Sequence, residues 1–229
     1  GTLHDDIAEA IGYHIPGDPD LLGVSPAAGF ALARGTWRWV RERRGLLATN
    51  FAELTGFMRL GPDSPKPEIQ YEFVIGLAMD HGRQIYWRHG MSCHVMILHP
   101  KSRGTVRISS PDHRADPLID FRYFSNPDDL PTLAAGAQRT ARIFATPSFR
   151  ELVRRDLVTA HCRTSEDWQA FCRNGGGTNY HPVGSCRMGP SQRDSVVDAR
   201  LRVHGLEGLR IIDSSIMPKI CGGNTTAPT

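Results

Sequence analysis

The sequence contains no long apolar segment and only five cysteines, which are widely spaced. No stretch approaches the roughly 20 consecutive apolar residues that span a bilayer, so we expect no transmembrane segment. The cysteines are odd in number and form no C-x-x-C pair, which argues against a disulfide framework and favours a reducing compartment. Gly1–Asp6 lacks the basic start and apolar core of a secretion signal. We therefore expect a cytoplasmic location.

Excess charge of one sign is also small. Twenty-seven Lys and Arg against 24 Asp and Glu give a net charge of +3, and apart from Arg41, Arg43 and Arg44 the basic residues are scattered. Because nucleic-acid binding normally needs a concentrated basic face, we expect no nucleic-acid partner. With 229 residues, 40% hydrophobic and 22% charged, the composition is that of a folded globular chain of one large or two small domains.

Motifs of several common enzyme classes are missing. The sequence holds no G-x-G-x-x-G or Walker A segment, and thus no dinucleotide-phosphate fingerprint. Neither Ser185 nor Ser214 lies in a G-x-S-x-G elbow, which argues against an α/β-hydrolase. His181 and Cys186 offer nitrogen and sulfur ligands, but their spacing matches no zinc pattern, so we expect no metal site.

The residue patterns predict an α+β fold. Apolar and polar residues alternate over 69–75, as in a strand with one buried face, and 91–98 and 105–109 are further strand candidates. Capping and turn residues predict helices at 27–44 after a Ser25 cap, at 126–145, from Pro147, and from Thr164 to about Asn174, and a β-hairpin at 201–212. Strands followed by helices, without regular βαβ alternation, favour an antiparallel sheet with helices packed on one face.

The segment Gly175–Gly189 is the first candidate site. Seven of its fifteen residues are Gly, Pro or Ser, so it forms no regular element, yet it holds His181. A histidine held in such a loop suits a positioned acid/base group, because neutral imidazole is available near pH 7. The alternative is that His181 only satisfies buried carbonyl groups in a tight turn, and the residues alone leave both interpretations open.

The C-terminal segment is the second candidate site. Ile211–Asp213 resembles an apolar strand that ends in an acid, which is a usual place for a residue that meets a ligand. Gly222 and Gly223 allow close approach of the backbone, and Asn224 offers a donor and an acceptor together. An ordinary polar loop, with Asp213 as a turn residue, is the alternative. Tyr71, Phe73 and Trp87 likewise either line a substrate pocket or belong to a strand core.

Three segments follow one another in an informative order: Leu98–Leu130, with Pro100-Lys101-Ser102 and a later acidic pair, then Tyr180–Gly189, then Val197–Thr229. Their order and spacing resemble those of the C-terminal part of glucose–methanol–choline (GMC) oxidoreductases, FAD-dependent enzymes that oxidise alcohols. The first resembles a stretch of the family's substrate domain, and the second its active-site loop almost residue for residue. The third resembles the closing segment that returns to the flavin.

The resemblance implies three parts of the chain. Residues 1–67 connect into the substrate domain, 68–174 form the substrate-binding domain, and 175–229 form the active-site loop and the closing segment that contacts the flavin. The glycine-rich FAD-binding part of the family is missing from this sequence. It is the implied partner, next to a small alcohol substrate. Asp6 stands where the family usually has His, and Thr226 where choline dehydrogenase relatives carry a second Asn.

The resemblance also implies a chemistry. In the family, a base takes the hydroxyl proton of the alcohol while its carbon delivers hydride to the flavin of FAD. By position, His181 resembles the base and Asn224 its active-site partner. The implied cofactor-binding residues are Asp213, Ser214, Thr225 and Thr226. A hydroxynitrile lyase on the same scaffold and a non-catalytic partner subunit are the alternatives.

Overall fold

The computed structural model describes residues 2–16, 21–23, 25–80, 86 and 88–229, and the chain forms two compact units. Unit 1 consists of Gly1–Ala8, Ile97–Thr132 and Gly177–Thr229, and unit 2 of Glu9–Met96 and Leu133–Gly176. Gly1 and Trp87, which entered the sequence analysis, lie outside the described residues. These boundaries differ from the three-part division implied by the resemblance, whose assignment of roles stays a prediction.

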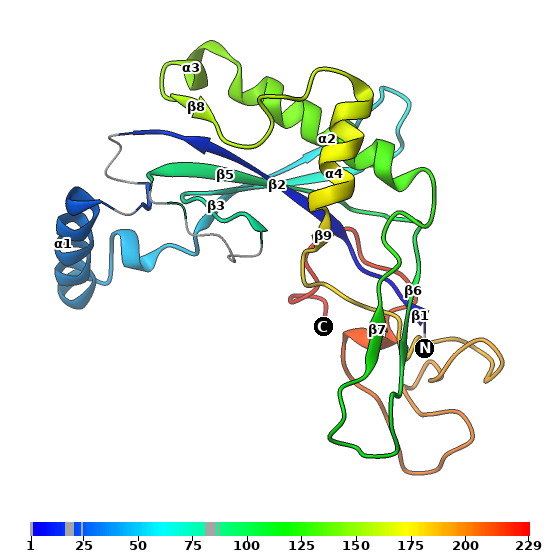
Figure 1. Cartoon of the computed structure of the whole chain (residues 1–229). Coiled ribbons are helices and arrows are strands. Elements are labelled where there is room, and N and C mark those ends of the chain that lie inside the picture. Colours follow the sequence, from blue (N-terminus) through cyan, green and yellow to red (C-terminus); the bar gives the residue numbers. More distant parts are fainter. Residues whose placement is uncertain (1, 17–20, 24, 81–85, 87) are drawn as a thin grey trace. The chain divides into compact units, whose positions relative to one another are not determined.

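Unit 2 is built on a sheet with the strand order β3-β4-β5-β2-β8 (Figure 1). Its strands are β2 (Ile7–His14), β3 (Ala52–Met58), β4 (Ile69–Val74), β5 (Gly90–Ile97) and β8 (Arg155–Asp156). β3 and β4 pair antiparallel, with Phe57 opposite Gln70 and Met58 opposite Ile69. The alternation over 69–75 therefore predicted a real strand. The pattern did not predict β2, because this strand is buried along most of its length on both faces.

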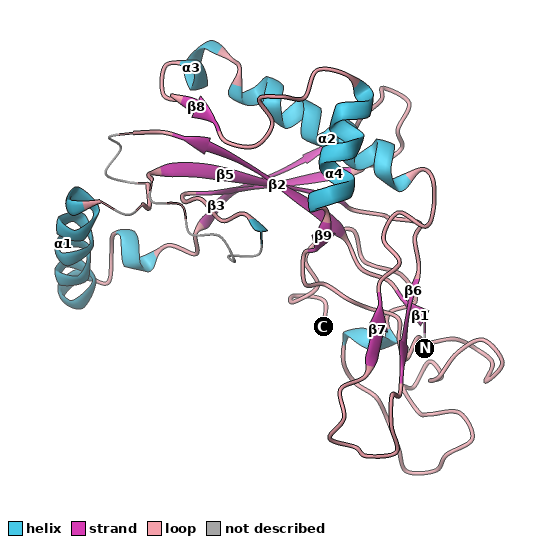
Figure 2. Cartoon of the chain, viewed as in Figure 1, coloured by secondary structure: helices cyan, strands magenta, loops and turns pink. Residues whose placement is uncertain are grey.

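The helices are α1 (Pro26–Glu42), α2 (Asp129–Phe144), α3 (Pro147–Arg150) and α4 (Ser165–Gly175). In Figure 2, α2 and α4 lie over one face of the sheet of unit 2. A Cβ atom added at Gly136 of α2 would lie 2.9 Å from side-chain atoms of both Ile69 and Val95, so the helix packs directly on β4 and β5. The predicted α+β arrangement, an antiparallel sheet with helices on one face, is confirmed.

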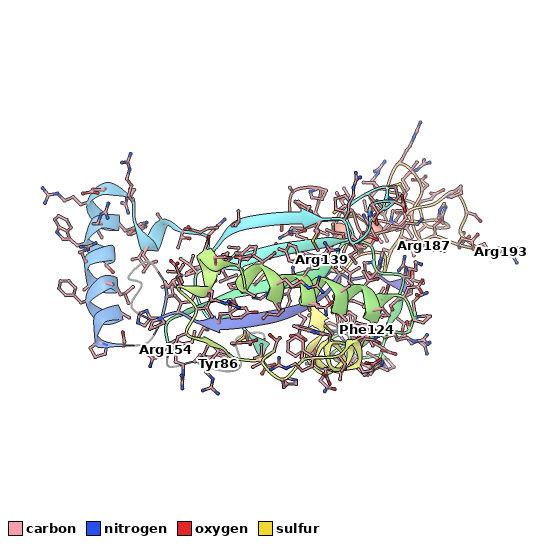
Figure 3. All side chains as sticks on the ribbon, turned by 90° about the horizontal axis from the view of Figure 1, so that it is seen from above. Tyr86, Phe124, Arg139, Arg154, Arg187 and Arg193 are labelled. Atoms are coloured by element: carbon pink, nitrogen blue, oxygen red, sulfur yellow. The ribbon has the colours of Figure 1, made fainter. Side chains whose placement is uncertain are left out.

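Two further contacts fix α2 on the sheet. Phe144, near its C-terminal end, stacks on Tyr13 of β2 with ring centroids 4.0 Å apart. Arg139, labelled in Figure 3, donates from Nη2 to the carbonyl oxygen of Leu60 at 3.1 Å, which ties the loop between β3 and β4 to the helix. The helix is thus held both by aromatic packing and by a hydrogen bond at its edge.

The predicted helix starts are confirmed where a local cap defines them, whereas the first helix ends at Glu42 and not at Arg44. The Ser25 hydroxyl accepts from the Ala28 N–H at 3.1 Å, and Thr164 forms a capping box with Asp167. The prediction for α2 was wrong by three residues at its start. Asn126 accepts from the Asp128 N–H at 3.0 Å and forms a turn that precedes the helix instead of capping it.

Unit 1 has little regular structure. β1 (Thr2–Leu3), β6 (Gly104–Arg107) and β7 (Leu118–Asp120) form an antiparallel three-stranded sheet in the order β1-β6-β7. The predicted strand at 105–109 thus joins a different sheet from β5. The predicted hairpin at 201–212 pairs antiparallel through Val203 N–H to Leu209 O at 3.0 Å, but only as an isolated bridge.

Glu9 of β2 is a buried carboxyl group in unit 2. It is 8% exposed, its Oε1 accepts from the Ala10 N–H at 2.9 Å, and its Oε2 has no hydrogen-bond partner among the described residues. A Cβ atom at Gly175, the last residue of α4, would lie 2.3 Å from this Oε2. Burial raises the pKa of Glu9 to about 8. Glu9 is therefore protonated at neutral pH in the folded protein.

This raised pKa predicts a loss of stability at alkaline pH. The pKa of Glu9 in the folded protein lies above the usual 4.5. Its contribution to the free energy of unfolding is therefore full below pH 4.5 and is lost as the pH rises through about 8. Glu9→Gln should raise the free energy of unfolding relative to wild type at pH 9 and change it much less at pH 5. Urea unfolding at both values measures this, with the exposed Glu166→Gln as control. An equal effect of Glu9→Gln at both pH values would contradict it.

Candidate active site

The extended N-terminal segment of residues 2–7, called the N-terminal strand below, and the loop after α4 run antiparallel to each other in unit 1. His4 and Val183 exchange two backbone hydrogen bonds of 2.9 and 2.7 Å, and Ile7 pairs with Thr178 of β9 (Gly177–Thr178). Between these two pairs, two residues of the strand face four residues of the loop, so the loop bulges. Tyr180 takes a positive φ of 67° in this bulge. The bulge turns the following residue, His181, back toward the strand.

His181 is held at two points by consecutive carboxyl groups of that strand. It is 9% exposed, its backbone N–H donates to Asp5 Oδ1 at 3.2 Å, and its ring Nδ1 lies 2.8 Å from Asp6 Oδ2. The first contact positions the backbone and the second the ring. The sequence pattern singles out His181 but gives no role to Asp5, and Asp6 differs there from the family pattern without an assigned role.

Asp5 is itself part of a buried polar cluster. The Tyr123 hydroxyl donates to Asp5 Oδ2 at 2.6 Å. Burial raises the pKa of Asp5, while hydrogen bonds from Thr178 and Tyr123 act in the opposite direction. Burial and the neighbouring carboxyl group of Asp5 also raise the pKa of Tyr123, so this hydroxyl stays protonated and remains a donor. Tyr123 was not identified from the sequence, where it lies more than a hundred residues from its partner.

The closing segment meets the same strand at His4. The Ile220 N–H donates to His4 Nδ1 at 3.1 Å, and His4 Nε2 donates to the Pro100 carbonyl oxygen at 2.8 Å. These two contacts define a neutral imidazole with its proton on Nε2. Burial, followed by the charge of Arg103, lowers the pKa of His4 to about 4. His4 therefore joins three segments that are far apart in the sequence.

The structure brings the two candidate segments of the sequence analysis together. Ser214 Oγ donates to the carbonyl oxygen of Pro182, the residue after His181, at 3.3 Å. The Cys186 N–H donates to Ser215 O at 3.0 Å, so the loop runs along the short 3₁₀ helix η3 (Ser214–Ile216). Asp213 caps η3 by accepting from the Ser215 N–H at 2.8 Å, which is the turn role, and its side chain is exposed.

The end of the closing segment presents polar groups at the surface. Asn224 and Thr226 are exposed and Thr225 is buried. The Thr225 carbonyl oxygen accepts from the Thr229 N–H at 3.1 Å, which closes one helical turn. Gly222 has φ +77°, and a Cβ atom there would lie 2.4 Å from His99, so the close approach expected of this glycine is made within the fold. The pairing of Asn224 with His181 stays a prediction.

Two residue sets from the sequence analysis have structural roles. Asp129 is buried and accepts from the Lys101 N–H at 2.8 Å and from both the N–H and the hydroxyl of Ser102 at 2.7 and 2.5 Å. The motif around Lys101 therefore fastens the start of α2. Tyr71 and Phe73 are buried side chains of the strand core, with ring centroids 6.4 Å apart.

The described part of the chain holds neither a metal-binding cluster nor a membrane-spanning helix. No group of three or more His, Cys, Asp or Glu residues there is arranged to hold a metal ion. No helix in the same residues has both the length and the apolar character needed to cross a membrane. All five cysteines are described, and each is a free thiol.

Comparison with known proteins identifies the family. The model of the GMC oxidoreductase family matches residues 100–229, which is more than half of the chain. The chain belongs to the GMC oxidoreductase family. It is 41% identical over 196 residues to an alcohol dehydrogenase [acceptor] of Pseudomonas putida, an alignment that covers 85% of this chain and 35% of that protein.

A choline dehydrogenase and two oxidases of known structure are also similar to this chain. An oxygen-dependent choline dehydrogenase of Escherichia coli O45:K1 is 38% identical over 192 residues, covering 83% of this chain and 34% of the relative. The chain thus spans about a third of the length of these curated relatives. The crystal structure of pyridoxine 4-oxidase from "Mesorbium loti" superposes with a TM-score of 0.79 at 25% identity, over 100% of this chain and 41% of that one. Formate oxidase of Aspergillus oryzae RIB40 gives a TM-score of 0.85 at 21% identity, over 99% and 44%, which shows the shared fold.

The buried, neutral His4 predicts acid sensitivity of the site. Its folded pKa of about 4 lies below the usual 6.5, so the unfolded chain binds the proton first, and stability is lost as the pH falls from 6.5 toward 4. His4→Gln keeps a donor for Pro100 and an acceptor for Ile220 and removes the titration. Urea unfolding between pH 7 and 4 should therefore show a flatter pH dependence for this variant. The same slope in both proteins would contradict the assignment; the exposed His113→Gln serves as control.

Proposed function

We propose that this chain supplies the substrate-side machinery of an FAD-dependent oxidoreductase that acts on CH–OH groups, with His181 as the general base. The observation that carries the proposal is the setting of His181. It lies in an irregular loop, is almost fully buried, and is held through its backbone by Asp5 and through its ring by Asp6. A histidine that only ended a turn would need neither contact. The alcohol dehydrogenase and choline dehydrogenase relatives support an alcohol as substrate.

The chain's own residues perform the proton step. His181 accepts the hydroxyl proton of the alcohol, because a neutral imidazole is a base of suitable strength near pH 7. Asn224 orients the same hydroxyl, since its amide offers a donor and an acceptor at once. When bound, FAD supplies the two-electron acceptor for the hydride that leaves the carbon.

The residues present fit the flavin in their hydrogen-bonding chemistry, because a carboxylate accepts from hydroxyl groups and a Ser or Thr hydroxyl both donates and accepts. Asp213 and Thr226 are exposed, and Ser214 adjoins the loop of His181 through its bond to Pro182. We assign Asp213, Ser214 and Thr226 to FAD contacts on this basis, and we add the buried Thr225 through the backbone position that the family resemblance implies. The sequence holds no glycine-rich phosphate-binding turn, so an N-terminal FAD-binding part is the proposed partner, and the chain alone should bind FAD poorly.

Neither alternative from the sequence analysis gains support. A hydroxynitrile lyase would use the same loop histidine without net redox chemistry, and no contact among the described residues favours it over oxidation. A non-catalytic partner subunit would have no need for a buried histidine held by two carboxyl groups.

The proposed base is tested by replacement in the complete FAD-containing protein. His181→Ala should slow reduction of the flavin by the alcohol by a factor of about 10²–10⁴, the usual contribution of a general base. Asn224→Ala should slow it less, because an amide orients the hydroxyl but takes no proton. Stopped-flow bleaching of the flavin measures both rates. The exposed His113→Ala is the matched control, and a His181→Ala rate close to that of wild type would overturn the proposal.

A further inference from the structure

We propose that Asp6 is a positioning residue for His181, which holds the proton on Nδ1 and thereby presents the lone pair of Nε2 to the substrate. The inference rests on the proposed function, because it assigns Asp6 a role through the base. It goes beyond that function, since the family match and the relatives say nothing of a carboxyl group at this point. It concerns only residues of this chain, all of which lie in unit 1.

The contact itself is short and shielded from water. Asp6 Oδ2 lies 2.8 Å from His181 Nδ1, and the two side chains are 3% and 11% exposed. The second oxygen, Asp6 Oδ1, is buried and has no hydrogen-bond partner among the described residues. A buried carboxylate is costly unless it is paired. The ring of His181 is therefore the main compensation for burying Asp6, and this couples the charge of one to the proton of the other.

The backbone around the contact leaves it little freedom to rearrange. The paired hydrogen bonds of His4 with Val183 close one side of the bulge, and the pairing of Ile7 with Thr178 closes the other. Asp5 adds a further contact, because its Oδ1 accepts from the His181 backbone N–H at 3.2 Å. The backbone pairing on both sides of the bulge thus holds the Asp6 carboxyl group against the imidazole of His181.

Two proton arrangements are compatible with this geometry, and only one gives a base. If Asp6 is ionised, Nδ1–H donates to it, and the lone pair of the neutral ring lies on Nε2. The O–H bond of the alcohol then breaks as the Nε2–H bond forms, and Nδ1 keeps its proton. The resulting imidazolium is stabilised by the adjacent carboxylate. If Asp6 instead carried the proton, Nε2 would already be protonated and could accept none.

The comparison variant is chosen from the other titratable groups that lie near the Asp6–His181 pair. Asp5 and Tyr123 interact electrostatically with Asp6, and so does the neutral His4 on the same strand. The printed contact of Asp5 with His181 is to the backbone, where Asp5 Oδ1 accepts from the His181 N–H at 3.2 Å, whereas the ring contact is made by Asp6. Asp5→Asn therefore removes a neighbouring carboxyl group and leaves the ring contact in place, which makes it the comparison for the tautomer.

The experiment uses the complete FAD-containing protein with ¹⁵N-labelled histidine. The ¹⁵N resonances of His181, assigned by their loss in His181→Gln, should show a protonated Nδ1 and an unprotonated Nε2 in wild type and in Asp5→Asn. Asp6→Asn should lose this single tautomer, because an amide can either accept from Nδ1 or donate to it. Flavin reduction in Asp6→Asn should be slower by about 10²-fold or more, toward the ~10⁴-fold loss seen for this change in a catalytic triad.

The pH profile separates positioning from a structural role. Without the carboxylate, the midpoint of the rate against pH should move to lower pH, because a nearby negative charge favours the protonated ring. A slower Asp6→Asn enzyme with an unchanged tautomer and midpoint would overturn the inference, as would a protonated Nε2 in wild type. Failure of the base role is distinguishable: His181→Ala would then reduce the flavin at the wild-type rate, whatever Asp6 does to the tautomer.

Discussion

The candidate site depends on the antiparallel pairing of residues 2–7 with the loop that follows α4. The His4–Val183 hydrogen bonds are the centre of this pairing, because His4 also accepts from Ile220 and donates to Pro100. A single short segment thereby determines the position of the candidate active-site loop and of the closing segment. The positions of the candidate site's side chains are therefore set by backbone hydrogen bonds within the chain, and no ligand takes part in them.

The same segment concentrates buried ionisable groups. His4, Asp5 and Asp6 are all at most 5% exposed, and each is compensated differently. His4 stays neutral between two backbone groups, Asp5 accepts from Tyr123 and from a backbone N–H, and Asp6 faces the ring of His181. Unpaired, such groups would cost more than the fold can sustain. Their close pairing in an otherwise irregular unit supports a functional origin.

The sequence predicted the features that depend on neighbours along the chain. Ser25 and Thr164 cap their helices as expected, because a cap needs only the next three residues. β2 was not predicted, since it is buried on both faces along most of its length and its sequence lacks the alternation of apolar and polar residues. The resemblance to a known family singled out His181 and Ser214. It could not reveal the residues that hold His181, because Asp6 and Asp5 lie 175 and 176 residues from it in the sequence.

The central claim is that His181 and Asn224 act on one hydroxyl group. A crystal structure of the complete FAD-containing protein with a bound alcohol analogue tests it most directly. The account predicts the analogue's oxygen within hydrogen-bond distance, roughly 3 Å, of both His181 Nε2 and the Asn224 amide. Side chains well over about 10 Å apart, or an oxygen that reaches neither group, would contradict it, since a general base must touch the proton it takes.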